Sequence, residues 1–218
     1  DNVAVGESAL YTNTTGDDNV AIGRLSLTSN TTANNNTAVG SEALRYNTTG
    51  YDNVAVGKNA LLLETTARDN IAVGTNVMDA NTTGGQNVAV GSNALGGNTT
   101  ASYNVAIGDS ALYANTTGTE NTAVGTFALD ANTTATNNAA FGYNALTANT
   151  TGTANTGIGR NALAGNTTAS NNTAVGFFSL NVNTTGTGNV AVGRIALDAN
   201  TTASSNTAIG NASMTANT

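Results

Sequence analysis

The residues best suited to chemistry are the Asn-Thr-Thr tripeptides, which recur every 17 residues along the chain. Each is an acceptor signal for N-linked sugar, and its hydroxyl groups are also potential acceptors for O-linked sugar. The same tripeptide is a turn signal, because Asn tolerates left-handed backbone angles and hydrogen-bonds its own backbone. The sequence leaves both interpretations open, a turn alone or a turn with glycan. The candidate glycosylation sites are Asn13, Asn30, Asn47, Asn81, Asn98, Asn115, Asn132, Asn149, Asn166, Asn183 and Asn200.

Acidic side chains are the other candidates for chemistry, since the chain has no His and no Cys. No acidic residue recurs at a fixed position in most repeats. Asp1, Asp18, Asp52, Asp69 and Glu120 share the first repeat position, but the other repeats carry uncharged residues there. They also lack the dense Asp and Gly spacing of a calcium-binding nonapeptide repeat. We therefore expect a solvated face, with no catalytic residue, no cofactor and no metal site.

The net charge of -7 makes nucleic acid an unsuitable partner, because phosphate binding requires clustered cations. The basic residues are scattered over different repeat positions: Arg24, Arg45, Lys58, Arg68, Arg160 and Arg194. No apolar run approaches the roughly 20 residues of a membrane span, so we expect no membrane insertion. An acidic, cysteine-free chain rich in Thr, Asn and Gly favours the outside of a microbial cell or a virion.

The elements that position these residues come from a 17-residue repeat written thirteen times, the last copy shortened. A period this short predicts a solenoid, in which each repeat buries its apolar side chains by stacking on its neighbours. We therefore predict an all-β parallel solenoid that forms one domain over residues 1–218. The repeats start at residues 1, 18, 35, 52, 69, 86, 103, 120, 137, 154, 171, 188 and 205.

Two apolar columns are candidates for the core. Val3 and Val5 fall on one face of an extended strand, with Ala4 on the other. We interpret the fifth position as deep core, the third as the edge of the core, and Ala as a site of close approach by another chain or layer. Leu or Met at the tenth position supplies the second core column. The predicted core of the first repeats is Val5, Leu10, Ile22, Leu27, Val39, Leu44, Val56, Leu61, Val73 and Met78.

Two further columns suggest corners and ladders. Gly recurs at the sixth position in all thirteen repeats, which is typical of a corner with positive φ or of close packing. Asn recurs at the second position in all thirteen repeats, and stacked amides can hydrogen-bond along a fibre axis. We therefore expect short strands or strand-like stretches that are joined by Gly corners and Asn-Thr-Thr corners.

The sixteenth position alternates strictly between Gly and Ala, which defines a 34-residue double unit. One interpretation is duplication of a two-repeat block, and we favour it because no other position alternates so strictly. The other is a coil of two repeats. One repeat per coil predicts a rod roughly 60 Å long from the strand spacing, whereas two repeats per coil predict about half that length.

Each unit contains a variant of the stretch Asn-Val-Ala-Val-Gly-x-x-Ala-Leu, which residues 87–95 match in full. This stretch resembles the YadA-like head repeats of trimeric autotransporter adhesins and related repeats of phage and viral tail fibres. The resemblance implies a left-handed parallel β-roll, three chains packed about a common axis, and an adhesive or fibrous extracellular role. The Asn-Thr-Thr segment makes this unit longer than a typical head repeat.

These observations favour a non-catalytic structural or adhesive fibre that is extracellular or on a cell surface. The expected partners are copies of the chain itself, as a trimer or an end-to-end filament, together with surface glycans or host receptors. The terminal repeats show no capping sequence, so we expect either that the chain continues beyond this segment or that its ends stack on other subunits to form a filament. The runner-up is the shaft of a phage or viral receptor-binding tail fibre.

A carbohydrate-binding module or an ice-binding surface is a more distant alternative. Carbohydrate binding predicts atypical repeats with clustered aromatic residues, and Phe177 and Phe178 form the one adjacent aromatic pair. We interpret that pair as a local variation in packing or at an interface. An ice-binding surface requires a flat Thr array, whereas adjacent Thr residues of an extended turn would point to opposite sides.

Overall fold

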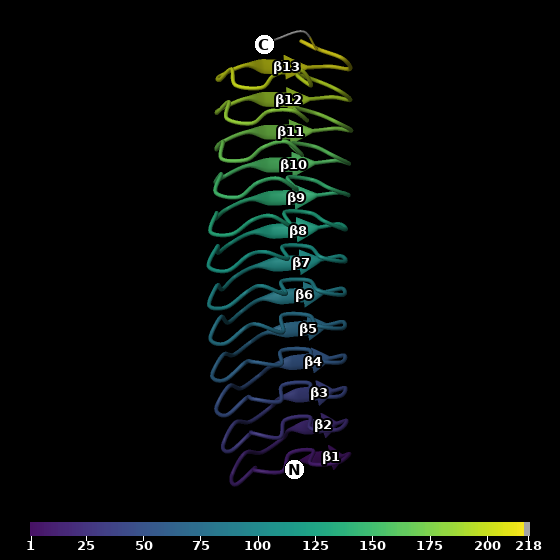
Figure 1. Ribbon diagram of the computed structural model, residues 1–218, viewed down its shortest axis with the longest axis vertical. Coiled ribbons are helices and arrows are strands. Elements are labelled where there is room, and N and C mark those ends of the chain that lie inside the picture. Colours follow the sequence, from purple (N-terminus) through teal and green to yellow (C-terminus); the bar gives the residue numbers. More distant parts are fainter. Residues whose placement is uncertain (216–218) are drawn as a thin grey trace.

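The computed structural model describes residues 1–215, which form a straight stack of coils (Figure 1). Each repeat contributes one three-residue strand, and the strands form a single thirteen-stranded parallel sheet in sequence order. The strands are β1 (Val3–Val5), β2 (Val20–Ile22), β3 (Thr37–Val39), β4 (Val54–Val56), β5 (Ile71–Val73), β6 (Val88–Val90), β7 (Val105–Ile107), β8 (Thr122–Val124), β9 (Ala139–Phe141), β10 (Thr156–Ile158), β11 (Thr173–Val175), β12 (Val190–Val192) and β13 (Thr207–Ile209).

One repeat makes one coil. In the register of the sheet Val3 pairs with Val20 and Val20 pairs with Thr37, so each residue lies beside the residue 17 places further along. The predicted parallel β-solenoid of 17-residue coils is therefore confirmed, and a coil of two repeats is excluded. The spacing of parallel strands gives a rod about 60 Å long.

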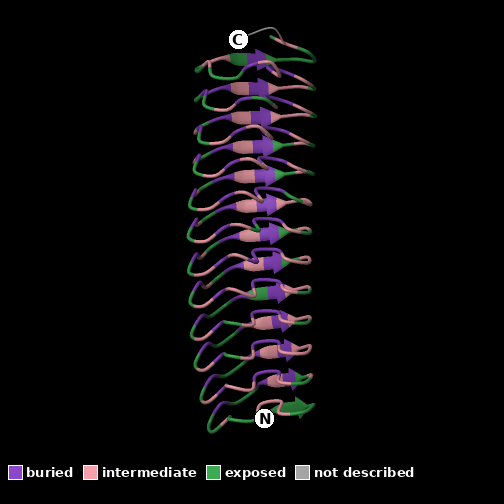
Figure 2. Ribbon diagram, in the orientation of Figure 1, coloured by how far each residue is buried: buried purple, intermediate pink, exposed green. Residues whose placement is uncertain are grey.

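The strands face the opposite way from the prediction. The central Ala of strands β2 to β9 and β11 to β13 is buried, whereas the flanking residues are exposed or half-buried (Figure 2). The assignment of the fifth position to the deep core was wrong, because these side chains lie on the outer face: Val5, Ile22, Val39, Val56 and Val73. The third position lies on the same outer face.

The narrow interior explains the inward Ala. At Gly157, the one strand centre without a side chain, an added Cβ would lie 3.3 Å from Cγ of Leu146 and 3.2 Å from the Ala162 carbonyl oxygen. Only a methyl group fits between the strand and the Leu column behind it. The close approach expected at this position is therefore confirmed, and it is made by layers of the same chain.

The tenth-position column forms the core as predicted. Leu27, Leu44, Leu61 and Met78 are fully buried, and Leu10 of the first coil is half-buried and packs against the same cluster. These residues adopt left-handed backbone angles, with φ of 48° at Leu27 and 49° at Met78. A left-handed Leu is unfavourable in isolation, and here burial of the side chain holds it.

The return stretch between the Gly corner and the Asn-Thr-Thr corner is a series of turns and contains no strand in the described coils. Left-handed residues recur in it at two positions, as at Asn59 and Leu61 with φ of 58° and 52°. These angles coil the backbone, so a second extended stretch cannot form there.

The sixth-position Gly is required by the stacking of the coils. Gly74 has a φ of 146°, and a Cβ on it would lie 2.5 Å from the carbonyl oxygen of Gly91 in the next coil. Both the backbone angle and the contact exclude a side chain. The sixteenth-position Gly is also crowded, since a Cβ on Gly84 would lie 2.2 Å from the carbonyl oxygen of Ala101. Because one repeat makes one coil, the alternation at the sixteenth position places Gly and Ala in neighbouring coils.

Candidate functional site: buried ladders and exposed faces

The second-position asparagines, from Asn2 to Asn206, form a column that we call the strand ladder and that is buried in the inner coils. Up to Asn189, each side-chain oxygen accepts the backbone N–H of the next Asn in the column, as Asn19 does from Asn36 at 3.0 Å. Each side-chain nitrogen over the same span donates to the sixteenth-position carbonyl of its own repeat, as Asn36 does to Gly50 at 2.8 Å. The column therefore satisfies backbone groups that would otherwise be buried without partners.

The thirteenth-position residues form a second column, the corner ladder, from Asn13 to Asn200. Asn132 shows the pattern: its amide nitrogen donates to the side-chain oxygen of Asn115 at 2.8 Å and to the Ala135 carbonyl at 3.1 Å. The two ladders meet at the sixteenth-position carbonyl, because Ala135 also accepts from Asn121 of the strand ladder at 2.8 Å. Polar groups that are buried and paired in this way tie each coil to the next.

The corner ladder argues against N-linked sugar at the candidate sites and favours the turn interpretation. An N-linked glycan must be joined to the amide nitrogen, and that atom is buried inside the coil and occupied by hydrogen bonds at the acceptor positions. Ten of the eleven candidate side chains are fully buried, and Asn13 of the first coil is half-buried while its nitrogen donates to Gly16 at 2.9 Å. The acceptor motif is local, whereas its burial results from stacking. The buried positions are Asn30, Asn47, Asn81, Asn98, Asn115, Asn132, Asn149, Asn166, Asn183 and Asn200.

The two Thr residues of each tripeptide differ in their surroundings. The first donates its hydroxyl to the carbonyl of the first Thr in the next coil, as Thr82 does to Thr99 at 3.0 Å. The second is exposed in every coil, from Thr15 to Thr202. The accessible hydroxyls of the corner therefore belong to the second Thr.

Glu64 is the one interruption of the corner ladder. Its Oε2 accepts hydrogen bonds from Asn70 at 3.0 Å and from Asn81 at 3.3 Å. Its Oε1 is buried without a partner, and so is Oδ1 of Asn47. In an intact step of the corner ladder, the amide nitrogen of the next Asn donates to the side-chain oxygen of the Asn before it, as Asn132 does to Asn115. Because the missing donor belongs to residue 64, we infer that a proton on Oε1 takes its place.

The electrostatics of Glu64 agree with this geometry. Burial raises the pKa of the Glu64 carboxyl to about 8, and the hydrogen bonds from Asn70 and Asn81 lower it by less. A pKa in that range keeps the carboxyl mainly protonated at neutral pH, as expected for an acid without a cationic partner in a dry interior. The sequence shows that Glu64 stands where the other repeats have Asn. Its burial and its unpaired oxygen become apparent only in the stacked coils.

The outer face of the sheet is uncharged and mainly apolar. The outward residues of the thirteen strands are Val, Ile, Thr, Ala and Phe, with no charged or amide side chain among them. Val90, Ile107, Phe141 and Ile158 are more than a third exposed. The fifth position is Val, Ile or Phe in all thirteen strands, and a monomeric protein rarely leaves so long an apolar strip in contact with water.

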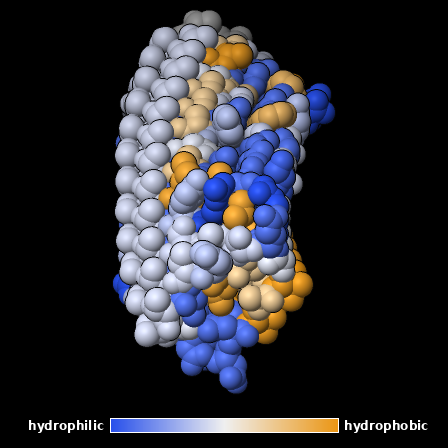
Figure 3. All heavy atoms as spheres, turned by 60° about the horizontal axis from the view of Figure 1, so that its bottom comes forward, coloured by the Kyte–Doolittle hydropathy of each residue, from blue (hydrophilic) through white to orange (hydrophobic). Residues whose placement is uncertain are grey.

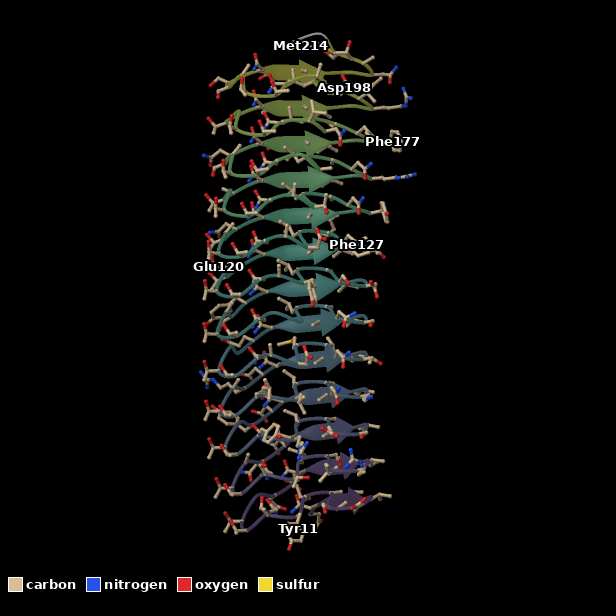
Figure 4. The ribbon with its side chains drawn as sticks, in the orientation of Figure 1. Tyr11, Glu120, Phe127, Phe177, Asp198 and Met214 are labelled. Carbon is tan, nitrogen blue, oxygen red and sulfur yellow. The ribbon has the colours of Figure 1, made fainter. Side chains whose placement is uncertain are left out.

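The first-position carboxylates do not converge. Asp1, Asp18, Asp52, Asp69 and Glu120 are exposed, and Figure 4 shows Glu120 on the edge opposite Phe127 and Phe177. Residues 1–215 contain no group of three or more His, Cys, Asp or Glu side chains that could hold a metal ion. That part of the chain also has no pocket and no helix long and apolar enough to cross a membrane.

No family model, curated protein or solved structure matches the chain. Its function is therefore inferred from the geometry of the coils. The features that bear on function are the two ladders, the apolar outer face of the sheet and the exposed Thr hydroxyls of the corners.

Proposed function

We propose that this chain is a non-catalytic structural fibre segment, a stiff rod that acts outside the cell or on its surface through contacts with copies of itself. Stiffness is supported by the number of ties between coils. Each step of the rod is held by strand pairing and by both side-chain ladders, as between Asn121 and Asn138 at 3.1 Å and between Asn115 and Asn132 at 2.8 Å. Each coil of a repeat array contacts only its neighbours, so bending the rod must distort these bonds between adjacent coils.

The observation that carries self-association is the uncharged outer face of the sheet. Flat sheets bury such faces against another layer about 10 Å away. This face repeats at the spacing of the coils, so a second copy of the same face matches it along its whole length. A trimer is the assembly that the resemblance to adhesin head repeats implies.

The surface around the rod supports an exposed, hydrated fibre. Figure 3 shows a regular array of side chains of intermediate hydropathy along one side of the rod, beside mixed polar and apolar side chains. The row of second Thr hydroxyls offers acceptors for O-linked sugar, and a glycan coat on this fibre would be attached there. An adhesive fibre and a tail-fibre shaft share this architecture, and they differ in whether a separate tip performs recognition.

The test of self-association places a charge on the outer face. In Val90→Asp and Ile107→Asp the new carboxylate lies on the strand surface without disturbing the inward Ala column. Sedimentation velocity should show an oligomer for the unmodified chain and a monomer for each variant, while circular dichroism keeps the same β signal. Thr117→Asp, on the exposed corner, is the matched control and should remain oligomeric.

Two results would overturn this proposal. One is a monomeric unmodified chain over the whole accessible concentration range. The other is an oligomer that withstands both strand-face charges, because the contact would then lie elsewhere. Electron microscopy of the native material then separates a continuous fibre from a shaft that ends in a distinct tip.

A further inference from the structure

Four consecutive coils carry alternating aromatic and arginine side chains at the seventh position: Tyr143, Arg160, Phe177 and Arg194. The guanidinium of Arg160 lies 5.6 Å from the ring centre of Tyr143 and 5.9 Å from that of Phe177. Arg194 lies 6.0 Å from the ring centre of Phe177. These side chains therefore form one continuous cation–π stack along the rod, which we call the arginine stack.

Further aromatic residues support the stack. Phe127 meets Tyr143 edge to face at 6.3 Å, and Phe178 lies 4.5 Å from Phe177. Tyr143 is 46% exposed and Phe177 is 41% exposed, so both residues remain partly accessible to solvent. Figure 4 places Phe127 and Phe177 on the same edge of the rod, where the chain turns after the strand. Cation–π contacts hold a guanidinium flat and leave its edge N–H groups free.

The charges of the stack are not neutralised within the described chain. Near the N-terminus, Arg24 and Arg45 pair with Glu42 at 2.6 and 2.9 Å, and Arg68 lies 3.8 Å from Asp69. By contrast, neither Arg160 nor Arg194 has an ion pair or a side-chain hydrogen bond among residues 1–215. An acidic rod thus presents two ordered, unpaired cations at one place on its surface.

We propose that the arginine stack binds an acidic polysaccharide that carries a carboxylate on every second sugar. Arg160 and Arg194 are two coils apart, about 9.5 Å along the rod by the strand spacing, which is comparable to the length of a disaccharide. The planar guanidinium fork matches a carboxylate in a bidentate manner. The partly exposed side chains of Tyr143 and Phe177 lie beside the arginines, where they contact the apolar C–H groups of the sugars.

The shape of the surface agrees with a polymeric ligand. Small-molecule sites are concave, and the described part of this protein has no pocket. A flat stack that runs along the rod suits an extended chain that lies parallel to it. The stack is at the corner edge and does not include the outward strand residues, so polysaccharide binding does not depend on self-association.

The test measures binding of a hyaluronan octasaccharide to the unmodified chain by isothermal titration at low salt. The double variant Arg160→Gln/Arg194→Gln should weaken binding by about tenfold or more, because two charge-assisted hydrogen-bond pairs are lost. Phe177→Leu should weaken binding less, by removing the contact that holds both guanidinium groups flat. The matched control Arg24→Gln/Lys58→Gln, which removes the same net charge elsewhere, should change the affinity by less than about twofold.

Three results would overturn the inference. The first is no binding of hyaluronan by the unmodified chain at low salt. The second is an equal loss in the control variant, which would indicate a non-specific charge effect. The third is equal or tighter binding of poly-glutamate, which would make the stack a docking site for an acidic protein. A neutral chitin oligosaccharide of the same length should not bind.

Discussion

The strand ladder and the corner ladder are both buried columns of asparagine, but only the strand ladder is unbroken. The difference follows from what each side chain supports. In the strand ladder, the side-chain oxygen accepts a backbone N–H, as Asn121 does from Asn138. In the corner ladder the backbone N–H is satisfied locally, since Glu64 N–H donates to the Leu61 carbonyl at 3.3 Å.

This difference explains why an acid is found in one ladder and not in the other. At residue 64 the backbone N–H keeps its partner, and the substitution removes the donors to Oδ1 of Asn47 and to the Ala67 carbonyl, which still accepts from Asn53 at 3.0 Å. An acid in the strand ladder would lose the equivalent donor and would also change the acceptor of a buried backbone N–H, as at Asn138. Two columns of the same residue therefore differ in how much change they tolerate.

The largest expected effect is the pH dependence of stability that arises from Glu64, the residue that interrupts the corner ladder. The carboxyl of Glu64 has a folded-state pKa of about 8, raised by burial above its ordinary value of 4.5. Between these two values the unfolded chain loses the proton while the folded chain keeps it. The free energy of unfolding therefore falls as the pH rises through this window, by at most about 1.4 kcal/mol per pH unit from this group.

Replacement of Glu64 by the consensus residue isolates that contribution. Urea unfolding of Glu64→Asn and of the unmodified chain should give similar stabilities near pH 4, and Glu64→Asn should become more stable by several kcal/mol near pH 8. Glu120→Gln, at an exposed first position, is the control and should follow the unmodified chain. Parallel curves for Glu64→Asn and the unmodified chain would mean that the carboxyl is not protonated in the ladder.

A smaller effect is expected when each ladder is cut in a single intact coil. Asn121→Leu removes the side-chain acceptor of the buried Asn138 N–H, and one orphaned donor costs about 1–3 kcal/mol. Asn115→Leu leaves the Asn132 amide bonded to the Ala135 carbonyl. We expect Asn121→Leu to lower the free energy of unfolding by about 3 kcal/mol and Asn115→Leu by about half as much.

Denaturation in urea at one pH measures both variants. Both positions are fully buried, so the cost of fitting a Leu side chain is similar. The difference between the variants then compares an orphaned backbone N–H at Asn138 with an orphaned side-chain oxygen at Asn98. An equal loss for the two variants would show that the ladders are equivalent and that the backbone bond does not set them apart.

Much of the fold could be predicted from the sequence because each column repeats in register. The period, the parallel strands and the Leu column, from Leu27 onward, all follow from that regularity. The orientation of the strands could not be predicted in the same way. Alternation places Val5 and Ala4 on opposite faces, but it does not state which face is inside. The choice is made by the width of the coil, where only a methyl group fits.

The candidate site shows the same limit. An Asn-Thr-Thr tripeptide is recognisable as an acceptor from three residues, but the burial of Asn98 results from coils that lie 17 residues away on each side. The meaning of Glu64 and of the arginine stack likewise depends on partners one coil apart. The roles of residues that contact neighbouring coils therefore cannot be predicted from the sequence of a single repeat.

The smallest expected effect separates the two threonines of one corner. The Thr116 hydroxyl donates to the Thr133 carbonyl at 3.1 Å, whereas Thr117 is exposed. Thr116→Val should lower the free energy of unfolding by about 1 kcal/mol, and Thr117→Val should change it by less than about 0.5 kcal/mol. Thermal unfolding of the two variants measures the difference. A larger loss for Thr117→Val would give the second hydroxyl a structural role, and it would then be a poor acceptor for sugar.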